Sequence, residues 1–175
     1  MKYLLPLTVL LFAGCGDSAT TESDTNDTSV STASSIDGSS FLAETEPEAA
    51  VDVIKARADA TDGGDVVVVG RIGGDYNPWV DGMAVFRLVD RSLKPCNEIP
   101  GDECPVPWDY CCETDKLPTS MVLVKFNDEN GRPLAAGAKE LFKVKELDTV
   151  VISGKVQKDD AGNVTVLASK MFVRK

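Results

Sequence analysis

Four cysteines close together are the side chains of this sequence best suited to chemistry. Cys96 and Cys104 are followed by the adjacent pair Cys111 and Cys112, all in one proline-rich stretch. Thiols at this density form disulfides, bind soft metal ions or exchange electrons. A bond between the neighbours Cys111 and Cys112 would be a strained ring. We therefore expect two disulfides that join Cys96 and Cys104 to Cys111 and Cys112, in one order or the other.

Two other chemistries remain open for the same four cysteines. A tetrathiolate site for zinc or iron would use all of them, but structural sites favour paired Cys-x2-4-Cys knuckles, which this spacing lacks. A thiol-redox centre needs a lowered thiol pKa, and the acidic neighbours Asp109 and Glu113 work against it. The spacing thus favours disulfides without a cofactor, with zinc or iron binding or thiol redox as the alternative.

Aromatic residues flank the cysteines on both sides. Trp108 and Tyr110 lie between Cys104 and Cys111, and Tyr76 and Trp79 follow the first predicted strand. Aromatic side chains form platforms for ligands, or they pack into a core. We expect a protein or saccharide ligand to meet the domain near these four residues, although packing of Trp108 against the disulfides is the simpler interpretation.

The chain has no histidine among its 175 residues. This removes the commonest general base and metal ligand, and every Ser-His or Cys-His nucleophile. No other catalytic constellation is visible in the sequence. The composition therefore favours a binding or structural module over an enzyme.

The N-terminal residues predict export. Lys2 is followed by an apolar stretch from Leu4 to Ala13, too short for a bilayer span but typical of a signal peptide. The run Leu10-Leu11-Phe12-Ala13-Gly14-Cys15 resembles a bacterial lipobox, which implies a signal peptide over 1–14 and lipid attachment at Cys15. The protein would then be membrane-anchored in the periplasm or at the cell surface, and Gly16 slightly favours the outer membrane.

A polar tether is expected to follow Cys15. Residues 15–44 are rich in Ser, Thr and Asp, and such a segment cannot bury enough apolar surface to offset its ordering entropy. Its acids account for most of the net charge of −10, because residues 16–50 contain no Lys or Arg. The remaining chain is not basic, which argues against a nucleic-acid ligand.

The elements that must position the cysteines belong to a domain over 45–175. A capping box at Thr45 and Glu48 predicts a short helix to about Ala58. Gly70, inside the first strand, predicts a bulge or a sharp curl. Apolar and β-branched runs predict five strands and a second short helix: strands at 65–72, 83–89, 121–126, 149–157 and 163–173, and a helix at 138–142.

This order of elements resembles an OB-fold. The resemblance implies a mainly β, five-stranded Greek-key barrel with a short N-terminal helix. The cysteines fall in a loop over 91–118, between the second and third strands, which an OB barrel does not need.

The cysteine loop carries a second resemblance. The run Cys104-Pro105-Val106-Pro107-Trp108-Asp109-Tyr110-Cys111-Cys112 resembles a signature of an uncharacterised secreted and lipoprotein family of planctomycete bacteria. The resemblance implies an exported protein and no particular activity.

Overall fold

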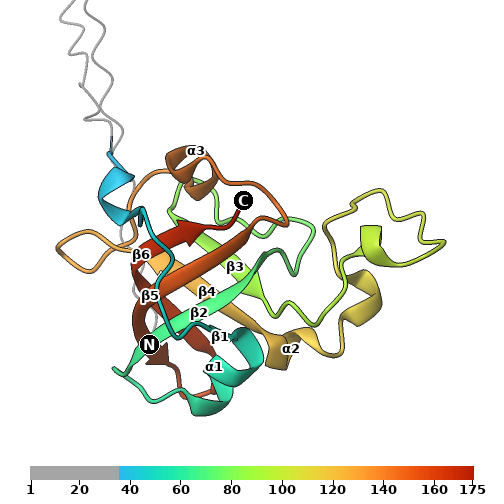
Figure 1. The fold of residues 1–175 in the computed structure, drawn as a ribbon, viewed down its shortest axis with the longest axis horizontal. Coiled ribbons are helices and arrows are strands. Elements are labelled where there is room, and N and C mark those ends of the chain that lie inside the picture. Colours follow the sequence, from blue (N-terminus) through green and yellow to red (C-terminus); the bar gives the residue numbers. More distant parts are fainter. Residues whose placement is uncertain (1–35) are drawn as a thin grey trace, which may run out of the picture. The chain divides into compact units, whose positions relative to one another are not determined.

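Five strands close into a small barrel in the computed structural model, which describes residues 36–175. The ring runs β2-β3-β4-β6-β5, and β5 pairs with β2 to close it (Figure 1). Every pair is antiparallel except β4–β6. The strands are β2 (Asp65–Ile72), β3 (Val85–Val89), β4 (Met121–Phe126), β5 (Thr149–Lys158) and β6 (Val164–Val173). The expected mainly β barrel of OB-like form is confirmed.

Short helices and single turns cover the barrel and its loops. The α-helices are α1 (Val53–Asp59), α2 (Leu117–Ser120) and α3 (Ala138–Phe142); the 3-10 turns are η1 (Ser39–Phe41), η2 (Cys96–Glu98) and η3 (Cys111–Glu113); and β1 (Val51–Asp52) is a two-residue strand. The predicted helix at 138–142 coincides with α3. No helix within residues 36–175 is long and apolar enough to cross a bilayer.

The barrel interior is filled by alternate residues of the strands. In β2, Val68 and Ile72 are fully buried in the main core. Gly70 lies between them, where an added Cβ would come within 2.7 Å of Leu88 Cγ and Val89 O on β3. The lack of a side chain therefore lets β3 approach closely.

Of the two features predicted as alternatives at Gly70, a bulge or a sharp curl, the bulge is wrong. The pairing of β2 with β5 is unbroken from Asp65 to Arg71, and the register shift lies instead at Ser153/Gly154, between β5 and β6. At Gly154 a Cβ would collide with the carbonyl of Leu167. A glycine within a strand signals close approach at both positions, but only one of them is a bulge.

The predicted start of the first helix is also wrong. α1 begins at Val53, because Val51 and Asp52 are drawn into β1, which pairs in parallel with β2. No hydrogen bond joins Thr45 and Glu48 in the described residues. A distant residue caps α1 instead: the Asp90 carboxylate accepts the Ile54 N–H at 2.7 Å.

The barrel unit begins before residue 45, the predicted boundary. The Phe41 ring packs edge-on against Phe126, with centroids 5.3 Å apart. Leu42 bridges Met171, whose carbonyl also accepts the Ala43 N–H at 2.8 Å. Apolar residues at the end of the expected tether thus add to the core. The predicted signal peptide, Cys15 and the predicted tether up to residue 35 lie outside the described residues.

Candidate functional site: the cysteine loop

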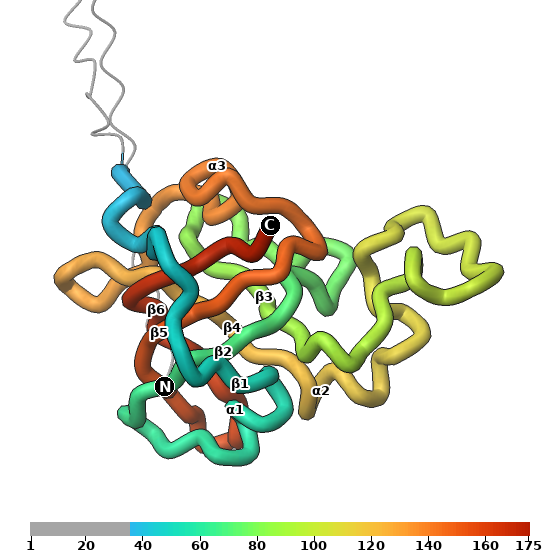
Figure 2. The backbone as a smooth tube through the Cα atoms, viewed as in Figure 1, coloured from blue at the N-terminus to red at the C-terminus, as the bar shows by residue number. Residues whose placement is uncertain are grey.

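The cysteine loop spans residues 90–120 between β3 and β4, and it extends to one side of the barrel (Figure 2). Two stretches of the loop run together: the Cys96 N–H donates to Asp109 O at 2.8 Å and the Asn97 N–H to Pro107 O at 3.0 Å. These bonds bring the segment around Cys96 next to the segment that ends in Cys111 and Cys112. The predicted insertion therefore has its own backbone structure.

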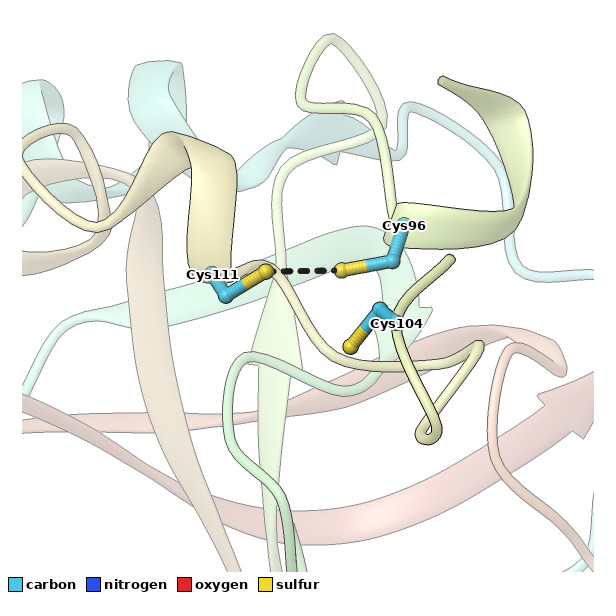
Figure 3. A group of neighbouring side chains, drawn as sticks. All are labelled: Cys96, Cys104 and Cys111. Carbon is cyan, nitrogen blue, oxygen red and sulfur yellow. Dashed lines mark hydrogen bonds between the residues drawn. The ribbon is translucent and has the colours of Figure 1, made fainter. Parts of the chain in front are cut away.

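Three of the four thiols converge. Cys96 is almost fully buried, and its Sγ lies 3.1 Å from Cys111 Sγ (Figure 3). Cys104 completes the group, in which every pair of sulfurs is within 4.8 Å. The three side chains come from η2, from the middle of the loop and from η3, so the fold of the loop gathers them.

Cys112 lies at the edge of this group. Its Sγ is 3.9 Å from Cys111 Sγ and 3.7 Å from a carboxylate oxygen of Asp102. Asp102, Cys111 and Cys112 form a second set with all ligand atoms within 4.8 Å, whereas Cys112 is absent from the first set. The described residues thus contain no ready-made site in which all four sulfurs are mutually close.

Asp102 is a member of the site that the sequence analysis missed. Its other carboxylate oxygen accepts the Cys104 N–H at 2.8 Å, two residues along the chain. An Asp that bonds the backbone two residues ahead is a common turn former. The pattern Asp-x-Cys was therefore a local signal for the turn, but the contact with Cys112 depends on the folded loop.

All four cysteines of the loop are free thiols in this structure. No two sulfurs among the described residues are at bonding distance, so the two disulfides stay a prediction. The 3.1 Å separation of the Cys96 and Cys111 sulfurs is compatible with one of the two expected pairings, in which the other bond would join Cys104 to Cys112.

The surroundings of Cys96 and Cys111 raise the pKa of both thiols. Loss of solvent raises the pKa of the Cys96 thiol to about 12. The pKa of Cys111 is also raised: its hydrogen bond with Cys96 lowers it, but desolvation and the thiols of Cys112 and Cys104 raise it by more. A thiol-exchange centre needs the opposite shift, so this geometry does not favour the redox alternative.

Two contacts fix the loop to the barrel. Tyr110, the residue before Cys111, is fully buried in a small cluster with Val89 and Leu93. Its ring lies over Gly73, where a Cβ would come within 2.8 Å of Tyr110 Cε2. Glu98, at the end of η2, accepts a hydrogen bond from Arg71 of β2 at 2.6 Å. The segments that carry Cys96 and Cys111 therefore each have an anchor on the barrel.

The four predicted contact aromatics do not form one platform. Tyr76 is 69% exposed, and its carbonyl accepts the Trp108 indole N–H at 3.1 Å, which joins the loop after β2 to the cysteine loop. Trp79 instead packs against Phe86 and donates to Glu146. Tyr110 is buried. Tyr76 and Trp108 are thus brought together, whereas Trp79 and Tyr110 serve the packing.

Comparisons with known proteins assign no family to the chain. No protein-family model and no curated protein matches the chain. One solved structure, "OBody AM1L10 bound to hen egg-white lysozyme", aligns with a TM-score of 0.40 and 19% identity, over 76% of this chain and 98% of that one.

Proposed function

We propose that this chain is an exported lipoprotein, anchored to the membrane through Cys15, whose OB-like barrel is a binding module with a disulfide-linked loop. The observation that carries the proposal is the 3.1 Å separation of the Cys96 and Cys111 sulfurs. The lipobox resemblance and the even number of cysteines in the loop support the exported, oxidising location.

The bond between Cys96 and Cys111 would close a loop whose ends are 15 positions apart. Closing such a loop removes conformational freedom from the unfolded chain and stabilises the fold by about 3 kcal/mol in the chain-entropy model. Both ends are already held by the anchors at Glu98 and Tyr110, so the cross-link would form with little movement of the backbone.

The ligand surface in this proposal is the junction of the two loops at Tyr76 and Trp108. An exposed tyrosine beside a half-buried tryptophan offers apolar area together with polar groups. Such a surface suits a saccharide ring or a protein loop. A nucleic-acid ligand is disfavoured, because the chain carries a net charge of −10.

The test is the oxidation state of the full chain purified without reductant. We expect the intact mass after denaturation to show the loss of four hydrogens from the loop cysteines, and peptide mapping to find Cys96 joined to Cys111. The matched variants are Cys96→Ser, which should free Cys111 for alkylation, and Cys112→Ser, which should free Cys104. Four alkylatable thiols in the wild-type protein would refute the cross-linked loop.

A second candidate is a metal site, favoured by the mutual closeness of Cys96, Cys104 and Cys111. Three thiolates would suit zinc or iron, with Cys112 or Asp102 supplying a fourth ligand after a small movement of the loop. Stoichiometric zinc or iron in the same preparation, with free thiols after denaturation, would favour this function. Metal retained in Cys112→Ser and lost in Cys104→Ser would assign the three-sulfur set.

A further inference from the structure

A pocket of about 520 Å³ opens at one end of the barrel, and none of the four aromatic residues discussed above lines it. Arg71, Arg91, Arg174 and Lys175 line it, and Asp148 is its only acidic residue. This is unexpected in a chain with a net charge of −10. From this geometry we infer that the pocket binds a phosphoryl group carried on a larger molecule.

The barrel itself brings the pocket residues together. Arg71, at the end of β2, pairs with Thr149 at the start of β5 and with Val89 at the end of β3. The Arg174 N–H, just after β6, donates to Thr149 O at 2.9 Å. Arg91 follows β3 by two residues. Three strands, β2, β3 and β6, therefore deliver their basic residues to the same end of the barrel, beside the start of β5.

Carboxylates behind the pocket hold the three guanidinium groups in place. Arg91 donates from Nε and Nη2 to the two oxygens of Asp52, at 2.6 and 3.0 Å. Arg174 likewise donates from Nε and Nη2 to the two carboxylate oxygens of Glu46, at 3.1 and 2.6 Å. None of the carboxylates that pair with the arginines lines the pocket. The arginines are thus oriented from outside, as preorganised anion sites require.

Each arginine keeps donors for a ligand. Nη1 of Arg91 and Nη1 of Arg174 make no hydrogen bond to any residue that the structure describes, and neither do Nε and Nη2 of Arg71. The three side chains are 24–37% exposed, so a ligand can reach them. Planar guanidinium forks match the geometry of phosphate oxygens and bind them with paired, charge-assisted hydrogen bonds.

The acid inside the pocket is neutralised by its own partner. Asp148 accepts the Lys145 backbone N–H at 2.9 Å and the Lys145 ammonium at 2.5 Å. Lys175 has no carboxylate partner among the described residues. Among the described residues, Lys175 is therefore the one basic side chain of the lining that no carboxylate pairs with, and the arginines offer an anion their remaining N–H donors.

The size of the pocket limits the ligand. A volume of about 520 Å³ lies within the range of small-molecule sites and exceeds what a lone phosphate would fill. The phosphoryl group would thus be part of a soluble phosphorylated compound or of a lipid head group. The inference does not depend on the state of the cysteines or on lipid at Cys15.

The first experiment is a calorimetric titration of the full chain with inorganic pyrophosphate, at low and at physiological salt. We expect Arg91→Gln and Arg174→Gln each to weaken binding about tenfold, because each removes one charge-assisted pair of hydrogen bonds. The matched control is Lys155→Gln. Lys155 also pairs with a carboxylate, that of Asp65, but it lies on β5 six residues beyond Thr149, which lines the pocket. Removing the charge of Lys155 should therefore leave the affinity for pyrophosphate unchanged.

A second arm separates the two sources of phosphate. Full-length chains carrying Cys15→Ser are sedimented with phosphatidylcholine vesicles, with and without phosphatidylglycerol. Extra sedimentation with phosphatidylglycerol that disappears in Arg174→Gln identifies a lipid head group, whereas arginine-dependent pyrophosphate binding alone identifies a soluble ligand. Binding that survives the arginine changes, or no binding in either arm, overturns the proposal.

A measurement on the wild-type chain guards against variants that fail to fold. Arginine-selective labelling with phenylglyoxal, mapped by mass spectrometry, is compared with and without saturating pyrophosphate. We expect protection at Arg91 and Arg174, but none at Arg132, which is 75% exposed and lies on the β4–α3 connection. Equal labelling of all three with and without pyrophosphate also refutes the site.

Discussion

Asp90 shows how much one buried carboxylate contributes to this fold. It is 3% exposed, and it accepts the N–H of Ile54 at the start of α1 as well as the N–H and hydroxyl of Ser92. Burial raises the pKa of Asp90, but these hydrogen bonds together lower it by more, so its pKa lies below the usual value. A carboxylate with a lowered pKa stabilises the folded state in its charged form.

Replacing Asp90 by alanine should therefore destabilise the barrel. We expect a loss of about 1–3 kcal/mol in the free energy of unfolding, because the Ile54 N–H loses its partner. Urea unfolding at neutral pH measures it, with Asp160→Ala in the exposed β5–β6 loop as the control. Equal effects of the two substitutions would contradict the capping role.

The pH dependence of Asp90 has a definite sign. Its contribution is complete above the unfolded pKa of about 3.9 and is lost as the pH falls through the lower pKa of the folded state. The stability difference between the wild type and Asp90→Asn should therefore shrink on acidification below about pH 4. A difference that stays constant down to pH values below the folded pKa would show that the charge of Asp90 is not involved.

Two substitutions at Tyr110 separate the contribution of its ring to stability from that of its hydroxyl. The hydroxyl is buried and has no hydrogen-bond partner among the described residues, and burial raises the pKa of Tyr110 to about 12. Tyr110→Phe should change the free energy of unfolding by less than about 1 kcal/mol, whereas Tyr110→Ala should cost about 3–5 kcal/mol through the cavity it leaves. Urea unfolding of both variants measures these two changes in the free energy of unfolding. A large cost for Tyr110→Phe would mean that a bound group satisfies the hydroxyl.

At the scale of elements, two glycines differ in what they permit. The absence of a side chain at Gly70 lets β3 pack closely against β2. A methyl group at this position would clash with Leu88 and with the carbonyl of Val89. We expect Gly70→Ala to destabilise the fold by about 1–3 kcal/mol, since the clash involves backbone. Gly137→Ala is the matched control, because the added methyl meets only the carboxylate end of the Glu140 side chain. Urea midpoints that shift equally would refute the close-approach argument.

Local sequence signals predicted the strands well. The valine run of β2 and the alternation of β4 are bounded by turn residues, so their period and ends are visible without tertiary contacts. The start of α1 was missed because its cap is Asp90, 36 residues away from Ile54. The convergence of Cys96, Cys104 and Cys111 was expected in outline. Asp102 was missed, and so was the arginine pocket, which depends on four strand ends meeting.

For the whole molecule, the anchoring proposal predicts fractionation behaviour. Cys15→Ser should release the protein from the membrane fraction, because no lipid could then be attached to that residue. Cell fractionation and immunoblotting measure the distribution, with Cys104→Ser as a control that removes a cysteine but leaves residue 15 unchanged. A Cys15→Ser protein that still sediments with membranes would rule out lipid anchoring at this residue.

Closure of the barrel places a constraint on when the protein can fold. Asp65 of β2 pairs with Lys155 of β5, about ninety positions later in the chain. Leu123 of β4 likewise pairs with Thr165 of β6. Neither β2 nor β4 can therefore complete its pairing until these later strands have been made. A nascent chain that lacks residues 149–175 leaves the edges of β2 and β4 without their partners β5 and β6, and such edges invite aggregation. Synthesis must therefore be nearly complete before the ring closes, and, if the chain is exported as we propose, the ring would close only after translocation.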